Sequence, residues 1–238
     1  MRALNIFCST LFLTSVLFLL PDVTAGQDTP LPRQERAEIA HEGIKTLKGG
    51  TLIVRLPSSQ AKANALKDIL SSTSPDNPNR KRIEKQLEET LADRKEFNEN
   101  MMAAFAEAYD FSNVYFMLDT ATSSLKSGQI QGFFLNSSLE ADPGIRLESA
   151  PPYFVLRFGS TSDMTTDGVE AMVIMNGQFE DLDKPFPFYQ RLHDFAAVMG
   201  SIFPVPDQKK KDALRIVGKL NTRLHEYYMR VMAIEEGS

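Results

Sequence analysis

The sequence predicts an α/β fold, a single domain with a mixed five- to six-stranded sheet flanked by helices, two of them long. Three observations lead to this prediction. Short runs rich in apolar, β-branched and aromatic residues alternate with segments whose apolar residues recur at helical spacing. Two helices separate the first two predicted strands, an order that suits a parallel crossover. The later strands are joined too closely for a crossover, so we expect them to meander antiparallel.

The first half of the domain is expected to contain three helices and two strands. The helices are recognised by the spacing of their apolar residues, and glycines or turn residues end them. In chain order the elements are a helix from Arg33 that Gly49-Gly50 ends, a strand at 51–56 (TLIVRL), a short helix at 61–70, a long helix to about Tyr109, and a strand at 112–118 (SNVYFML).

The second half is expected to hold the remaining strands and two more helices. Asn176-Gly177 is a strong hairpin signal and predicts that residues 172–175 pair with residues 178–182. The other expected elements are strands at 132–135 (GFFL), 153–158 and 169–175, a helix with Tyr189, Leu192, Phe195, Ala196 and Met199 on one face, and a long last helix from Asp207 to about Ile234.

Residues 1–26 have the three-part layout of a secretory signal peptide. Arg2 supplies a positive start, residues 6–20 form an apolar run, and small residues around Ala25-Gly26 offer a cleavage site. The apolar run is shorter than the about 20 residues that a membrane-spanning helix needs. We therefore expect a secreted or periplasmic protein with no transmembrane anchor after cleavage. Residues 27–32 would then be a flexible lead-in and residues 33–238 the α/β domain.

The composition excludes several classes of protein. Cys8 is the only cysteine and lies in the predicted signal peptide, so the mature chain has no disulfide and no thiolate chemistry. A formal net charge of -5 argues against a protein built to coat nucleic acid. The sequence contains no Gly-rich phosphate loop, no catalytic-serine elbow and no histidine motif for a metal. No cofactor and no metal site are predicted.

Arg55 and Asp119 are the first candidates for ligand binding. Asp119 follows the second predicted strand, and Arg55 lies near the end of the first. Open α/β sheets bind ligands beyond the carboxyl ends of parallel strands, so these two side chains are expected to lie close together. The alternative interpretation is that Asp119 starts a turn and Arg55 shields a sheet edge.

The loop 159–168 (GSTSDMTTDG) is the second candidate region. It follows a strong strand and is rich in hydroxyl and carboxylate side chains, among them Ser160, Thr161 and Asp163. Functional residues concentrate in such loops, which makes these three residues candidates for ligand binding. A solvated connection is the alternative, because the same composition is ordinary loop chemistry.

A basic row on the last helix is the candidate surface for a macromolecular partner. Lys211, Arg215, Lys219 and Arg223 recur at i, i+4 spacing and suit an acidic partner or an anionic envelope surface. The alternative is the solvated face of an amphipathic helix. No aromatic residues interleave the row for base stacking, so nucleic acid is not a predicted partner.

Five segments together resemble a group of uncharacterised secreted proteins of the Bacteroidota. They are GTLIVRLPS (50–58), FSNVYFML (111–118), QGFFLN (131–136), YFVLRFG (153–159) and PFPFY (185–189). The resemblance covers most of the mature chain and implies a cell-envelope location in a Gram-negative bacterium. It implies no activity, and it transfers no catalytic residues to this chain.

Taken together, these observations favour a non-catalytic binding or interaction protein of the cell envelope, whose partner is an envelope protein or a small ligand. The alternative is a hydrolase or transferase that uses Asp119 and a loop carboxylate, Asp163 or Asp167, as acid and base. The two hypotheses differ in whether Asp119 and the 159–168 loop line one cleft.

Overall fold

The structure is a computed structural model that describes residues 32–147, 152–161, 168–192 and 207–237. All of them belong to one compact unit, Pro32–Ser238, that is separate from Met1–Leu31. The predicted signal peptide, most of the lead-in, Asp163 and Asp167 lie outside the described residues.

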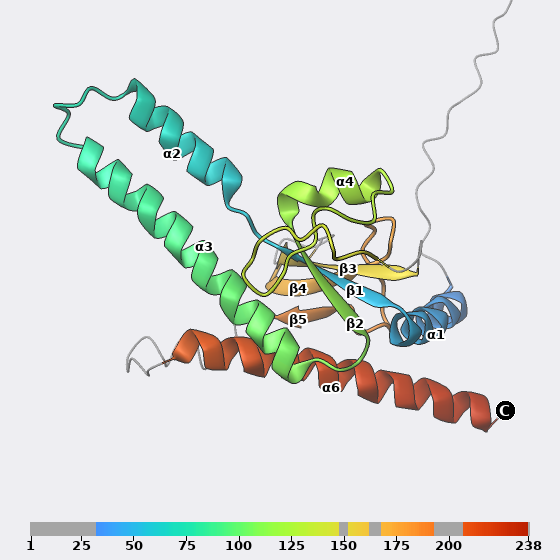
Figure 1. The fold of residues 1–238 in the computed structure, drawn as a ribbon. Helices are drawn as coiled ribbons and strands as arrows, with labels where there is room; N and C mark the ends of the chain where they lie inside the picture. The colour runs from blue at the N-terminus through green and yellow to red at the C-terminus, as the bar shows by residue number, and fades with distance from the viewer. Residues whose placement is uncertain (1–31, 148–151, 162–167, 193–206, 238) are drawn as a thin grey trace, which may run out of the picture. The chain divides into compact units, whose positions relative to one another are not determined.

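A five-stranded mixed sheet forms the centre of this unit, with strand order β2-β1-β3-β4-β5 (Figure 1). The strands are β1 (Thr51–Leu56), β2 (Asn113–Leu118), β3 (Tyr153–Ser160), β4 (Glu170–Met175) and β5 (Tyr189–Arg191). β1 pairs parallel with both β2 and β3, whereas β4 pairs antiparallel with β3 and β5. The sheet therefore confirms the α/β prediction, the early parallel crossover and the antiparallel late strands.

Strand β1 is buried on both faces of the sheet. Leu52, Ile53, Val54 and Leu56 are all 0 % exposed. A strand with parallel neighbours on both sides is typically covered by helices above and below, and it reads as a continuous apolar run. In the run TLIVRL, Arg55 is the one charged residue.

Different elements cover the two faces (Figure 1). On one face, Leu52, Val54 and Leu56 pack with residues of three helices, α1 (Arg33–Gly49), α3 (Arg80–Ala108) and α6 (Gln208–Glu236). On the other face, Ile53 packs with Leu125 of the short helix α4 (Thr122–Lys126) and with Phe134 in the chain that follows it. Helix α2 (Gln60–Ser72) follows β1 and packs on α3. The two long helices of the prediction are α3 and α6.

The predicted strand at 132–135 was wrong. Phe134 and Leu135 form only isolated bridges, to Met117 and Ala141 respectively. The Leu135 amide donates to the Phe116 carbonyl at 2.8 Å, so this segment touches the free edge of β2 without extending the sheet. The aromatic residues that suggested a strand are instead the cover of the second face.

Two expectations for residues 178–191 were also wrong. After the turn at Asn176, the chain makes a single bridge between Met175 and Asp181 instead of a paired strand. Pro185 and Pro187 follow, and proline cannot donate to a β-ladder. The open edge of β4 is filled by Tyr189–Arg191, which forms β5 where a helix was expected. The rest of that expected helix, from residue 193, lies outside the described residues.

A polar cluster ties the turn between α3 and β2 to helix α6. The Asp110 carboxylate accepts hydrogen bonds from Asn221 Nδ2 and from His225 Nε2, both at 2.8 Å. These two hydrogen bonds, the Asn221 bond first, lower the pKa of Asp110, and the positive charge of Lys48 adds to them. The ionised form of Asp110 therefore stabilises the fold.

Asp110→Asn is expected to lower the melting temperature at pH 7 but not in acid. A carboxyl group whose pKa is depressed by folding contributes stability above its unfolded pKa, ordinarily 3.8, and loses it as the pH falls through the folded value. The difference between variant and wild type should therefore shrink steadily below pH 4. Melting curves from pH 7 to pH 2 measure it. Asp76→Asn, in the exposed turn before α3, is the matched control. A deficit that stays constant over this range would contradict the assignment.

Candidate functional site

The chain leaves the ends of β1 and β2 toward opposite faces of the sheet. After β1 it passes to α2 and α3, and α3 lies on the same face as α6; after β2 it passes to η1 (Asp119–Ala121) and α4 on the other face. Such a switch point in an open α/β sheet leaves a crevice outside the carboxyl ends of the strands, which is where ligands bind.

A cavity of about 670 Å³ lies at this switch point. We call it the β1–β2 crevice. Among the residues that line it are Arg55, Ser58, Ser59, Lys62, Asp119 and Thr122. Its volume lies in the range of small-molecule sites. The structure thus brings together Arg55 and Asp119, the two residues that the strand-end argument selected.

Arg55 is the half-buried cation of the crevice, whereas Lys62 is exposed. Burial is the main cause that lowers the pKa of Arg55. Asp119 opposes this shift, whereas Arg157, the register partner of Arg55 on β3, adds to it by repulsion. None of the described residues accepts a hydrogen bond from the Arg55 guanidinium.

Arg157 differs from Arg55 because its guanidinium is already paired. It donates to both carboxylate oxygens of Asp181, at 3.0 and 3.3 Å, and to the Ser160 carbonyl at 2.8 Å. A guanidinium with these partners is neutralised locally. Of the two neighbouring arginines, Arg55 is therefore the one whose guanidinium has no hydrogen-bond partner among the described residues.

The loop from β1 to α2 is fixed by its neighbours. The Ser58 amide donates to Asp119 Oδ1 at 3.0 Å, and the Pro57 carbonyl accepts from Asn98 Nδ2 of α3 at 3.1 Å. Ser59 has a φ of 52°, in the left-handed region that costs a non-glycine residue about 1–2 kcal/mol. Asp119 begins η1 directly after β2, as the alternative interpretation expected of a turn residue, and its carboxylate in addition fixes the rim of the crevice.

The first turn of α2 adds backbone donors to this rim. The Gln60 amide is taken by Ser58 Oγ at 3.2 Å, and the first amide that reaches a helical acceptor is that of Ala63, which donates to the Ser59 carbonyl. The amides of Ala61 and Lys62 lie between them, where an α-helix offers no backbone acceptor. Together with the Lys62 side chain, they make this side of the crevice electropositive.

Sequence reasoning missed Ser58, Ser59 and Lys62, although a signal for them existed. Pro57-Ser58-Ser59 stands directly between a buried strand and a helix, and a β-to-α turn of this kind presents the helix amides at the carboxyl edge of the sheet.

Ser160 and Thr161 lie at the same edge of the sheet, because β3 is parallel to β1, but they do not line the crevice. Ser160 pairs with Glu170 of β4, and the Thr161 amide donates to the Val169 carbonyl at 3.0 Å. Asp163 and Asp167 lie outside the described residues. The carboxylate pair of the hydrolase hypothesis therefore stays a prediction.

The structure separates the members of the predicted basic row on α6. Arg223 donates to the Tyr189 carbonyl and to Gln190 Oε1, and so anchors β5. Arg215 donates to Asp212 at 3.1 Å, one turn away on the same helix. Lys211 and Lys219 are exposed. Two members of the row, Arg215 and Arg223, therefore make hydrogen bonds within the protein. The docking role of the row stays a prediction.

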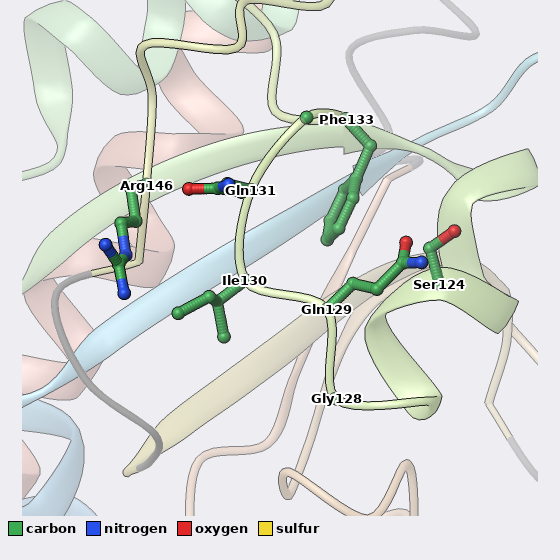
Figure 2. Close-up of a pocket in the computed structure, with 8 residues that line it drawn as sticks. Ser124, Gly128, Gln129, Ile130, Gln131, Phe133 and Arg146 are labelled. Atoms are coloured by element: carbon green, nitrogen blue, oxygen red, sulfur yellow. The ribbon is translucent and has the colours of Figure 1, made fainter.

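A second hollow, of about 580 Å³, lies at the loop 128–133 (Figure 2). Gln129 points toward Ser124 and lies near Phe133 on one side of this loop, whereas Ile130 and Arg146 lie on the other side. Gln131 points toward Arg146, so the polar side chains form two groups on opposite sides of the loop, whereas those of a ligand site converge on one point. We therefore take the β1–β2 crevice as the candidate site.

Within the described ranges, no three His, Cys, Asp or Glu side chains are placed to share a metal ion. In the same ranges, no helix combines the length and apolarity needed to cross a bilayer. No protein-family model, curated protein or solved structure matches the chain significantly.

Proposed function

We propose that this chain is a non-catalytic binding protein of the cell envelope whose β1–β2 crevice holds a small anionic ligand. The single observation that carries the proposal is the half-buried Arg55 guanidinium, which has no hydrogen-bond partner among the described residues. The ligand group would be a carboxylate or a phosphate, the groups that a guanidinium binds with two parallel hydrogen bonds.

A bound anion would offset the unfavourable free energy of the partly buried Arg55 charge. Burial disfavours the charge on Arg55, and Arg157 on the next strand repels it. Asp119 attracts Arg55, but its Oδ1 is occupied by the Ser58 amide. A ligand oxygen at the Arg55 donors would offset the burial and face the electropositive first turn of α2.

The binding geometry is set before any ligand arrives. Hydrogen bonds from two other elements, Asp119 after β2 and Asn98 on α3, fix the loop that forms the rim. A site held in this way does not lose the free energy of ordering a loop when the ligand binds. This rigidity supports recognition, and the described part of the crevice supplies no pair of carboxylates for acid–base catalysis.

The envelope location rests on the layout of residues 1–26 and on the absence of cysteine from the mature chain. A protein without thiols tolerates an oxidising compartment unchanged. The resemblance to secreted Bacteroidota proteins supports the same location.

Expression of the full chain in a Gram-negative host is expected to give a periplasmic protein that begins at Gly26 or Gln27. Leu13→Arg puts a charge into the apolar run and should keep the protein uncleaved in the cytoplasm. Cell fractionation measures the location of the wild type and of Leu13→Arg, and N-terminal sequencing shows whether each has been cleaved. A wild-type chain that keeps Met1 and stays in the cytoplasm would refute the envelope part of the proposal.

Arg55→Gln is expected to weaken anion binding about tenfold, equivalent to about 1.4 kcal/mol, because it removes the half-buried charged donor of the crevice. Isothermal titration with pyrophosphate and with citrate separates a phosphate site from a carboxylate site. Arg82→Gln, an exposed arginine near the start of α3, is the matched control and should bind like the wild type.

Asp119→Asn sharpens this experiment. The asparagine oxygen can still accept the Ser58 amide, but the negative charge beside Arg55 is lost. Anion affinity should therefore rise severalfold, and the melting temperature should fall because the half-buried Arg55 charge loses its attraction to Asp119. The crevice would be excluded as an anion site if neither anion bound the wild type saturably, or if Arg55→Gln bound as tightly as the wild type.

A further inference from the structure

A separate cavity of about 440 Å³ lies between the segment Lys184–Tyr189 and the second half of α6. We call it the aromatic cavity. Among the residues that line it are Lys184, Phe188, Tyr189, Arg223, Tyr227 and Arg230. It shares no lining residue with the β1–β2 crevice. The segment Lys184–Tyr189 contains PFPFY (185–189), which has no part in the proposed function.

The walls of this cavity are built from aromatic rings held in place by the core. Phe186 is 3 % exposed, stacks on Phe154 with an interplanar angle of 8°, and lies edge-on to Tyr227. Phe188 and Tyr189 are partly exposed, with ring centroids 5.0 Å apart. Arg223 fixes the backbone of this segment through the Tyr189 carbonyl and lies 5.9 Å from the Tyr189 ring. The rings therefore offer a preformed apolar surface.

Positive charge dominates the rim. Three cations, Lys184, Arg223 and Arg230, line the cavity together with one carboxylate, Glu226. Within the described part of the chain, neither Lys184 nor Arg230 makes an ion pair, and both are exposed. In a protein of net charge -5, this local excess of cations favours an anion.

A buried polar group in the wall also lacks a partner. Tyr227 is 8 % exposed, and its hydroxyl has no hydrogen-bond partner among the described residues. Burial raises the pKa of this hydroxyl, and the charge of Arg230 opposes the shift. Because the hydroxyl atom itself is closed to water, Tyr227 contributes its ring, and not its hydroxyl, to the cavity wall.

We propose that the aromatic cavity is a second binding site, which takes an aromatic carboxylate or phosphate. The anionic group lies at Lys184 and Arg230, and the flat ring packs against Phe188 and Tyr189. Cations combined with aromatic walls select for both parts of such a ligand, because the rings bind the apolar body and the cations bind the charge.

Isothermal titration with three probes tests this combination. 2-Naphthoate carries both parts, 2-naphthylmethanol carries the rings without the charge, and acetate carries the charge without the rings. The wild-type protein is expected to bind 2-naphthoate saturably and at least tenfold more tightly than either of the others. Equal affinity for 2-naphthylmethanol, or no saturable binding of 2-naphthoate, would overturn the proposal.

Removing the charges of Lys184 and Arg230 tests whether 2-naphthoate binds in the aromatic cavity. The double variant Lys184→Gln/Arg230→Gln should weaken 2-naphthoate binding at least tenfold. Lys81→Gln/Arg82→Gln, an exposed pair at the start of α3, is the matched control and should leave affinity unchanged. A loss of 2-naphthoate binding in Arg55→Gln but not in Lys184→Gln/Arg230→Gln would place the ligand in the β1–β2 crevice and overturn the second site.

Discussion

The burial of β1 on both faces is the constraint on which the rest of the structure depends. Four of its six residues are fully buried, between parallel neighbours on either side. Both faces must therefore be covered, one by α1, α3 and α6 and the other by α4 and the chain after it, and the connections that leave β1 and β2 depart toward these opposite faces. The same requirement opens a crevice where they part. Arg55 is the one charged residue of this strand, and it lines the crevice.

The loop beyond Arg55 shows how local structure and function are joined. Asp119 and Asn98 come from elements far apart in the sequence, yet both bond to the short turn Pro57-Ser58-Ser59. These bonds hold Ser59 in a left-handed conformation that it would not adopt alone. The first-turn amides of α2 are thereby fixed beside Arg55. Core packing, turn geometry and electrostatics thus converge on one small region.

The sequence was sufficient for the elements that local patterns determine. Continuous apolar runs predicted β1, β2, β3 and β4, and helical spacing predicted α1, α3 and α6. The sequence failed where contacts with distant parts of the chain decide a segment's structure. Phe134 covers a sheet face where a strand was expected, and Tyr189–Arg191 pairs with the open edge of β4 where a helix was expected. For the site, Arg55 and Asp119 were predictable because strand ends meet at one edge. For Ser58 and Lys62 the turn Pro57-Ser58-Ser59 was a signal, but their role also depends on the direction in which α2 leaves the sheet, which the sequence does not give.

An NMR titration of the isotope-labelled domain with pyrophosphate is the most direct test of the central claim. Backbone amide shifts report where an anion binds without any substitution in the protein. The account predicts that the largest shifts fall on the amides of residues 58–62 and on the Arg55 side-chain Nε–H. Shifts that are absent there, or that are largest along α6, would contradict the assignment of the β1–β2 crevice as the anion site.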